Sequence, residues 1–513
     1  EFLFGLIFAI VCKINNKNPF NIKTRISFWL KSLISKIWQL FHKKEFLVLF
    51  LVWFGGFFLR IYRLDDLLGF YYDQGRDALK VSEILTLKDL PAIGPTTGLS
   101  GIFLGPFWFY FITPFYWLGG GDPAIAAAFI GLIDSLTIIL LYFVGKHFFS
   151  KKVGFLAAVF WAFSYWLIRS ARWFSNPSPI PFFTMILVWG LGEWLINRKQ
   201  KWLPIIFVCL AISTQLEVAS AVFYFPAILF LILFFKIQIK QLLRQKYFWL
   251  GIILFLLFLL PQFAFEIKNN FVMSRNLLGF FGGEVNTATG ESWAIPTKEI
   301  IFQRLNWYYQ VFFAHLDPNL KLPKIIVGLI WSILVIHSLL KTKKSFFSLI
   351  FIFWLTPLIF LLFFIGNYGN LYDYYLTGFF PVFILLSAFV FSRLPSLITV
   401  IFLFYFFWQN GILTRGYLFS GLDGPITISL GNQKQTIEWV CQEAKNEPFN
   451  IDIYVPPVIP YSWDYLWQWY GCKNLKCCPT KNLTPILYTI YEVDSPHPER
   501  LENWLKDRRL LVK

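Results

Sequence analysis

The sequence predicts an all-α polytopic membrane protein, with about eleven or more transmembrane helices, and a small α/β domain outside the membrane. Three observations lead to this fold class. The 513-residue chain is 57% hydrophobic and only 15% charged, whereas roughly a quarter of the residues of a soluble domain are charged. Apolar runs long enough to cross about 30 Å of hydrocarbon recur along the chain. After Arg415 the composition changes to that of a soluble domain.

The predicted spans follow from hydropathy and length. They lie at 46–62, 123–146, 153–168, 179–196, 202–213, 219–235, 248–265, 324–340, 346–365, 376–391 and 397–412. Before them, lysines alternate with apolar residues at helical spacing over 27–41, which predicts a helix lying on the inner membrane surface. The apolar run at 1–14 is expected to be the end of a truncated span.

The distribution of basic residues predicts the orientation of these spans. Four short loops, 146–152, 197–201, 236–246 and 341–344, contain Lys and Arg but no acidic residue. They all fall on the cytoplasmic side if the proline-interrupted segment 102–118 does not cross the membrane. We therefore expect 102–118 to be juxtamembrane or re-entrant, and the net charge of +17 to reflect topology rather than nucleic-acid binding.

The C-terminal hundred residues predict the α/β domain. The stretch `TIEWVCQEAKNE` has the pattern of an amphipathic helix, and `FNIDIYV` and `PILYTIYEV` have the pattern of strands. The aromatic stretch `YSWDYLWQWYG` is expected to form core rather than to stack on sugars. On the oxidising side of the membrane, Cys472 is expected to pair with Cys477 or Cys478. The predicted domains are thus 1–45, 46–412 and 413–513.

This topology collects polar residues from separate loops on the outer face. They are Asp73, Arg76 and Asp77 in the first loop, Arg169, Arg172 and Asn176 in the second, Gln215 and Glu217 in a tight turn, Arg275, Arg304 and His315 in the loop 266–324, and Tyr372, Asp373 and Tyr375. Carboxylates and arginines at one membrane edge suit a substrate with a phosphate head and an apolar tail.

Each group also has a structural alternative. Arg169 and Arg172 can serve as interfacial anchors, and Glu217 as a helix cap. The tyrosines can form an aromatic belt. For Asp134 and Glu193 the structural role is favoured. The five histidines show no metal-ligand spacing.

The order of these motifs resembles the GT-C superfamily of integral membrane glycosyltransferases, in particular its protein O-mannosyltransferase and aminoarabinose-transferase branch. The resemblance rests on `YYDQGRDALKVSEIL`, `GIFLGPFWFYF`, `SARWFSNPSPIPFF`, `TQLEVAS` and `YDYYLTGFFPVF`, and it extends over 46–412. It implies transfer of a sugar, with inversion, from a polyprenyl-phosphate donor to a protein, lipid or glycan acceptor on the outer face of the cell membrane.

The resemblance also implies roles for individual residues. Asp73 would be the general base, with Asp77 orienting Arg76 or the acceptor. The substrate-binding positions would be Arg76, Arg169, Arg172, Asn176, Gln215, Glu217, Tyr372, Asp373 and Tyr375. The chain departs from the family at Gln74, where Glu is frequent, and at Asn176, where Asp is frequent.

These departures bear on cofactors. The second negative charge that a metal would need is missing, so no metal site and no cofactor is expected, although a role for a divalent metal stays open. The donor reaches the site through the membrane and needs no nucleotide-binding loop. A transporter of lipid-linked sugars, and a polymerase or ligase of lipid-linked glycans, are the alternative functions.

Overall fold

The computed structural model describes residues 44–99, 101–282, 296–319, 324–342, 345–364, 371–419, 428–456, 459–494 and 496–509. The segments predicted at 1–14 and 27–41 lie outside these residues. The chain divides into two units, 1–54 and 55–513. Helix α3 (Lys44–Ile61) crosses the boundary between the units, and everything else below belongs to the second.

Apolar helices occupy the positions that hydropathy predicts. Among the described residues, five segments are long and apolar enough to cross a membrane: α7 (Pro123–Phe148), α15 (Lys246–Lys268), α19 (Ser345–Phe363), η3 with α20 (Asp373–Phe379 and Phe380–Arg393) and α21 (Ser396–Leu418). Shorter apolar helices fill four more positions: α10 (Ile180–Leu195), α11 (Leu203–Leu216), α12 with α13 (Val218–Ala221 and Tyr224–Phe234) and α18 (Lys324–Thr342). With α3 and one bent pair, these account for all eleven predicted segments.

The bent pair corrects the prediction of one continuous span at 153–168. Helix α8 (Lys151–Phe163) ends at Ser164, and α9 (Tyr165–Arg172) continues at an angle of 60°. Ser164 is extended, with φ −68° and ψ 124°, so it cannot carry the helix through. The backbone N–H of Tyr165 instead donates to Asn410 Oδ1 of α21 at 2.8 Å. A side chain far along the chain therefore stabilises the break.

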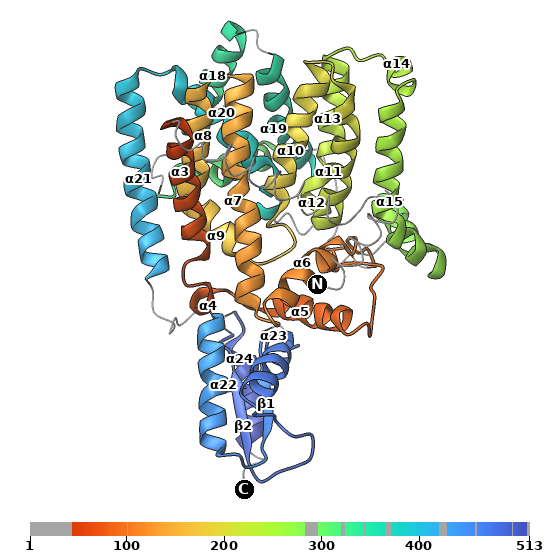
Figure 1. The fold of residues 1–513 in the computed structure, drawn as a ribbon, viewed down its shortest axis with the longest axis vertical. Coiled ribbons are helices and arrows are strands. Elements are labelled where there is room, and N and C mark those ends of the chain that lie inside the picture. Colours follow the sequence, from red (N-terminus) through yellow and green to blue (C-terminus); the bar gives the residue numbers. More distant parts are fainter. Residues whose placement is uncertain are drawn as a thin grey trace, which may run out of the picture. The chain divides into compact units, whose positions relative to one another are not determined.

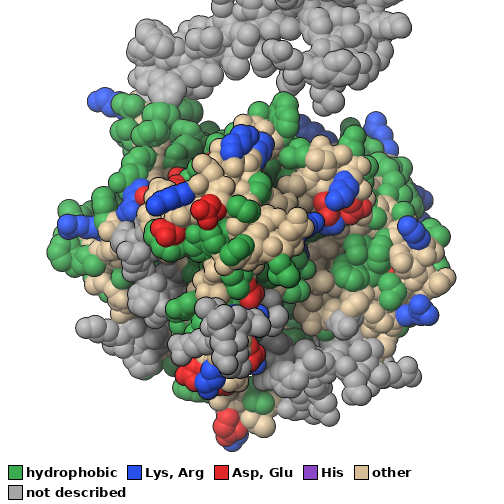
Figure 2. Space-filling view, turned by 90° about the horizontal axis from the view of Figure 1, so that it is seen from below, with side chains coloured by type: hydrophobic (Ala, Val, Ile, Leu, Met, Phe, Trp, Pro, Cys, Tyr) green, Lys and Arg blue, Asp and Glu red, His purple; other side chains and the backbone are tan. Residues whose placement is uncertain are grey.

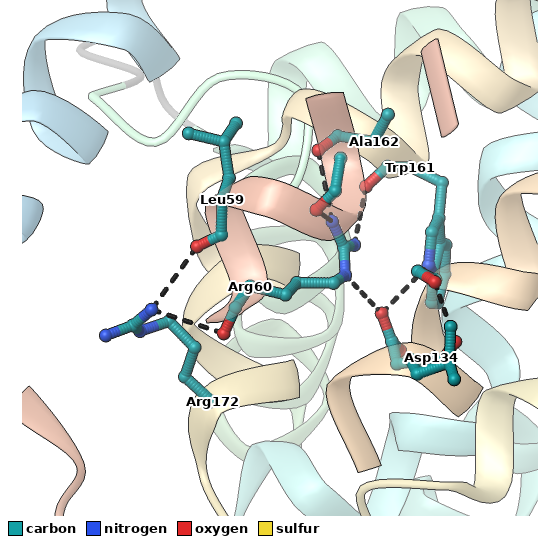
Figure 3. Close-up of polar contacts among 9 residues, drawn as sticks. Leu59, Arg60, Asp134, Trp161, Ala162 and Arg172 are labelled. Carbon is teal, nitrogen blue, oxygen red and sulfur yellow. Dashed lines mark hydrogen bonds and ion pairs between the residues drawn. The ribbon is translucent and has the colours of Figure 1, made fainter. Parts of the chain in front are cut away.

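A buried ion pair joins the ends of α3 and α8 to the middle of α7 (Figure 3). Arg60 Nε donates to Asp134 Oδ2 at 2.6 Å, and its other nitrogens donate to backbone carbonyls, including that of Trp161 at 3.0 Å. The Trp161 indole N–H also donates to Asp134, at 3.3 Å. A charge buried at this depth is tolerated only when it is paired and hydrogen-bonded. The structure thus gives Asp134 one hydrogen-bond partner on α3 and one on α8.

The first loop forms two helices beneath the bundle, α5 (Tyr72–Leu85) and α6 (Phe107–Leu118). Helix α5 begins with a capping box in which the Tyr71 N–H donates to Gln74 Oε1 at 3.1 Å. Helix α6 has 12 residues, fewer than the roughly 20 that a span requires. Helix α6 packs against α5 and α11, and its length agrees with the predicted juxtamembrane or re-entrant segment.

The C-terminal residues form the predicted small α/β domain. Helix α22 (Leu430–Ala444) precedes β1 (Asn450–Tyr454), and β1 pairs in parallel with β2 (Leu487–Tyr491), with Asn450 opposite Leu487 and Tyr454 opposite Tyr491. Between the strands lie α23 (Tyr461–Leu466) and the π-helical η4 (Trp467–Asn474), and α24 (Pro498–Arg509) follows β2.

Aromatic side chains and two disulfides stabilise this domain. The side chains of Trp463, Tyr465, Trp467 and Trp469 are buried, so this stretch forms core as predicted. Cys472 pairs with Cys478, one of the two expected partners. Cys441 of α22 pairs with Cys477, a disulfide that the sequence analysis did not predict.

The C-terminal domain packs on the first loop (Figure 1). The Leu430 N–H donates to the Leu68 carbonyl at 2.8 Å, and Trp469 Nε1 donates to the Gly120 carbonyl at 3.0 Å. The approach is closest at Gly75 of α5, where an added Cβ would lie 2.2 Å from the backbone nitrogen of Ser462. Only glycine fits there. The domain therefore lies directly beside the acidic end of α5.

Candidate active site

Three charged residues at the start of α5 form one ion-pair network. Arg76 Nη1 lies 2.8 Å from Asp73 Oδ1, three residues earlier on the same helical face, as predicted. Arg76 also donates from Nε and Nη2 to Asp77 Oδ1, at 2.9 and 2.7 Å. The second oxygen of Asp77 accepts from the Trp108 indole of α6 at 2.7 Å. Arg76 is thus held between two carboxylates.

The two carboxylates differ in their exposure. The Asp73 side chain is 60% exposed, whereas that of Asp77 is 2% exposed. Burial raises the pKa of Asp77 above its ordinary value, although Arg76 and Trp108 oppose the shift by stabilising the charged form. Asp77 is therefore placed to position Arg76, and Asp73 is the carboxylate that an incoming molecule can reach.

An aromatic cluster links α5 to the second loop. Tyr71 stacks on Trp173, with ring centroids 5.5 Å apart. Arg169, which is exposed, lies over the rings of Tyr165, Trp166 and Tyr417 at 5.9, 5.6 and 5.3 Å.

The C-terminal domain contributes a carboxylate to this cluster. Burial and the nearby Glu492 raise the pKa of Tyr71, while Arg169 lowers it. Burial also raises the pKa of Glu492 to about 7, against the effect of the hydrogen bond that Trp463 Nε1 donates to it at 2.8 Å. Residues of α5, α9 and the C-terminal domain therefore meet around Tyr71.

Arg172 has different surroundings from Arg169. It is 3% exposed and donates from Nη1 to the carbonyls of Leu59 and Arg60, at 3.3 and 3.2 Å (Figure 3), and to that of Tyr62 at 2.8 Å. Its Nε donates to the Tyr417 hydroxyl at 3.2 Å. These carbonyls lie at the C-terminal end of helix α3, where the macrodipole favours a cation. Arg172 thus caps α3, and of the two arginines Arg169 is the more accessible.

Asn176 and Glu217 come together from two loops. Asn176 Nδ2 donates to the Leu216 carbonyl and, at 3.4 Å, to Glu217 Oε2. Glu217 Oε1 accepts from the Ala219 N–H at 3.1 Å and caps α12. Burial raises the pKa of Glu217 to about 7, and the hydrogen bonds from Ala219 and Asn176 oppose this shift. Glu217 thus caps the N-terminus of α12 and also anchors the second loop through Asn176.

The remaining predicted residues lie around this turn. Gln215 is buried, donates to the Phe258 carbonyl at 2.7 Å and accepts from the Phe107 N–H at 3.3 Å, so it joins α6, α11 and α15. Tyr372 and Asp373 are exposed at the start of η3, and the ring of Tyr375 lies 5.8 Å from that of Tyr372. Helix α12 is bonded to η3 through Ser220 Oγ, which accepts from the Gly378 N–H at 3.2 Å.

The predicted residues therefore form two groups that the second loop connects. The first contains Asp73, Arg76, Asp77 and Arg169, and the second contains Asn176, Glu217 and the η3 tyrosines. Sequence reasoning missed Trp108, Tyr417 and Glu492, which complete the first group. They come from distant parts of the chain. Trp108 lies in the predicted segment 102–118 and Glu492 in a predicted strand, but neither was expected at the site. Within the described residues, no cluster of three or more His, Cys, Asp or Glu side chains could hold a metal ion.

Comparison with known proteins adds independent evidence. Residues 104–265 match the family model described as dolichyl-phosphate-mannose-protein mannosyltransferase. The fold is similar to that of ArnT from Cupriavidus metallidurans in the apo state, with a TM-score of 0.53 at 12% identity over 91% of this chain and 89% of that one. For the same protein bound to undecaprenyl phosphate, the TM-score is 0.52 at 12% identity, over 85% and 88%. None of the curated proteins matches this sequence.

Residues 104–265 therefore resemble a family of protein mannosyltransferases, and the fold is similar to that of ArnT over most of both chains.

Proposed function

We propose that this enzyme transfers a sugar from a polyprenyl-phosphate donor to an acceptor on the outer face of the membrane, with Asp73 as the general base. The observation that carries the proposal is the exposed Asp73 carboxylate, held 2.8 Å from Arg76 at the start of α5. A hydroxyl is a poor nucleophile until a positioned base accepts its proton. The Arg76 guanidinium favours the ionised carboxylate that this role requires.

The proposed reaction is a single displacement. The acceptor oxygen attacks the anomeric carbon while Asp73 takes its proton. The bond between that carbon and the phosphate oxygen breaks, and the bond electrons leave with the polyprenyl phosphate, so the anomeric configuration inverts. The leaving group gains a negative charge, which a nearby guanidinium stabilises. Arg169 is the accessible candidate for this contact.

Two features support an outer-face location. Both disulfides lie in the C-terminal domain, and disulfides persist in oxidising compartments. Viewed from the end where this domain lies, acidic and basic side chains are interspersed over the surface (Figure 2). The four loops assigned to the opposite face carry basic residues alone.

The relatives support the class of donor. One solved ArnT structure contains undecaprenyl phosphate, and the matched family is described by a dolichyl-phosphate-linked mannose. Both are polyprenyl phosphates. We accordingly propose a polyprenyl-phosphate sugar as donor and leave the sugar and the acceptor to experiment.

The test uses the full chain reconstituted in lipid nanodiscs. It is incubated with a panel of synthetic polyprenyl-phosphate sugars and with a cell-envelope extract as the source of acceptors, and release of free polyprenyl phosphate is followed by mass spectrometry. At least one member of the panel should be consumed by the wild-type chain and far more slowly by Asp73→Asn. Consumption of nucleotide sugars in place of the lipid-linked ones would overturn the proposed donor class.

A further inference from the structure

A small groove lies on the side of α21, away from the candidate active site residues of α5. Its cavity volume is about 230 Å³. One wall is formed by Phe407, Gly411, Thr414 and Leu418, which are spaced so that they share one face of a helix. The opposite wall contains Leu59 of α3 and Phe163 at the end of α8. The groove therefore runs along the last turns of α21.

The groove is apolar except at two adjacent residues. Thr414 is 6% exposed, and its Oγ1 has no hydrogen-bond partner within the described part of the chain. A buried hydroxyl without a partner is costly. Arg415 lines the same groove, is exposed, and makes neither an ion pair nor a side-chain hydrogen bond with any described residue. The groove is thus lined by one residue with an unpaired, buried hydroxyl and by one exposed arginine, beside an apolar channel.

The location of the groove indicates that it faces lipid rather than water. α21 lies at the edge of the bundle (Figure 1), and its outward side chains are large and apolar: Ile401, Phe404 and Trp408 are 58%, 75% and 67% exposed. Such a surface is in contact with lipid chains. Arg415 lies one turn before the end of α21 at Leu418, the depth at which a membrane arginine meets the headgroup layer.

We propose that this groove binds an anionic glycerophospholipid of the leaflet on the side of the C-terminal domain. One acyl chain fills the channel between Leu59 and Phe407. The phosphate accepts hydrogen bonds from Arg415, and an ester carbonyl accepts one from Thr414 Oγ1. A polyprenyl phosphate has the anionic head but no acceptor on its chain below it, so it would leave Thr414 unpaired.

The bound lipid would lie near the two arginines of α9, although it is away from the residues of α5. Tyr417, two residues after Arg415, accepts a hydrogen bond from Arg172 and contacts Arg169. The carbonyl of Leu59, whose side chain lines the groove, accepts from Arg172. A lipid in the groove would therefore hold the end of α21 against α3 and α9.

The test measures lipid retention by the full chain. The protein is purified in detergent, exposed to phosphatidylglycerol, phosphatidylcholine or undecaprenyl phosphate, and examined by native mass spectrometry. The groove should retain one phosphatidylglycerol in preference to the other two. Arg415→Gln should weaken this retention about tenfold, the size expected for the loss of a charge-assisted hydrogen bond.

Two glycine variants locate the site. Added Cβ atoms at Gly411 and Gly416 both meet nothing within 4 Å, so leucine is tolerated at either position. Gly411 lines the groove and Gly416 does not. Gly411→Leu should therefore abolish retention, while Gly416→Leu should behave like the wild type. A phosphatidylglycerol with a photoreactive acyl chain should label the peptide that contains Phe407.

Two results would contradict the proposed lipid site. Equal retention of phosphatidylglycerol by the wild-type, Arg415→Gln and Gly411→Leu chains would overturn the proposal. A preference for undecaprenyl phosphate over phosphatidylglycerol would also overturn it, and would assign the groove to a polyprenyl chain. Neither result bears on the role of Asp73, which is tested by turnover.

Discussion

Asp73 and Asp77 lie one helical turn apart on α5, yet their surroundings give them different roles. Asp73 contacts Arg76 and remains largely exposed, whereas Asp77 is buried against Arg76 and Trp108. A base must reach the proton that it accepts, and a buried carboxylate with both oxygens hydrogen-bonded cannot. The pair therefore separates into a carboxylate that can react and one that orients Arg76.

Substitution of the two aspartates should separate these roles. Asp73→Asn should lower turnover by about 10²–10⁴-fold, the usual contribution of a general base, and leave the melting temperature unchanged. Asp77→Asn should lower turnover less and also lower the melting temperature, because it weakens the network around Arg76. The measurements are initial rates with the lipid-linked donor and thermal unfolding. Normal turnover of Asp73→Asn together with an inactive Asp77→Asn would reverse the assignment.

The two arginines of α9 offer a second comparison. Arg172→Ala should destabilise the protein by about 1–3 kcal/mol, because it removes the donor that caps α3. Arg169→Ala removes an exposed side chain and should preserve the melting temperature. It should weaken binding of the donor about tenfold or more if Arg169 contacts the phosphate. Binding can be followed by thermal shift with undecaprenyl phosphate as the probe. Unchanged binding by Arg169→Ala would make this residue an interfacial anchor.

Glu492 provides a prediction about pH. Its pKa is raised from 4.5 to about 7. Between these two pH values, Glu492 is therefore protonated in the folded protein and ionised in the unfolded chain. The resulting stabilisation is fully present below pH 4.5 and disappears as the pH rises through about 7. Glu492→Gln keeps the neutral form, so this variant should melt at a higher temperature than the wild type at pH 8 but not at pH 4.5. The same substitution at the exposed Glu447 serves as control, and an identical pH profile for both variants would contradict the prediction.

At the scale of the elements, hydropathy located the apolar helices and the period-2 pattern located both strands of the C-terminal domain. Local sequence could not predict the break at Ser164, because no proline or glycine marks it and its partner, Asn410, is on α21. The Cys441–Cys477 disulfide could not be predicted for the same reason, since it depends on how α22 packs on η4. Arg172 stays predicted as a phosphate ligand, and its contacts with carbonyls of α3 could not be predicted because they exist only in the folded structure.

The break itself can be tested through Asn410. This side chain accepts from the Tyr165 N–H and donates to the carbonyls of Leu316 and Phe406, at 3.3 and 2.9 Å. Asn410→Leu leaves a buried N–H without a partner and should lower stability by about 1–3 kcal/mol. The melting temperature in detergent measures this effect. A comparable substitution at the neighbouring half-buried Gln409, whose Oε1 accepts from Asn319 Nδ2 at 3.1 Å, changes the same helix without touching the break. An equal loss in both variants would contradict the role of Asn410.

At the scale of the whole molecule, the proposed function requires that the first loop and the C-terminal domain share a side of the membrane. Their contacts satisfy this requirement, because α5 packs on α23 and α4 (Leu64–Leu67) packs on α22. The basic loops of the opposite face and the disulfides are the observations that identify that side. If the assignment were reversed, the acceptor would be cytoplasmic.

Cysteine labelling in intact cells tests the orientation directly. Lys88 in the first loop and Lys240 on α14 (Ile239–Leu243) are both exposed and lie on opposite predicted faces. With Cys12 replaced by serine, the described cysteines are either buried, as Cys209 is, or in disulfides. Lys88→Cys should therefore react with an impermeant maleimide added outside the cell, whereas Lys240→Cys should react only after permeabilisation. The reverse pattern would move Asp73, Arg169 and the C-terminal domain to the cytoplasm, where the positive-inside tendency does not place them.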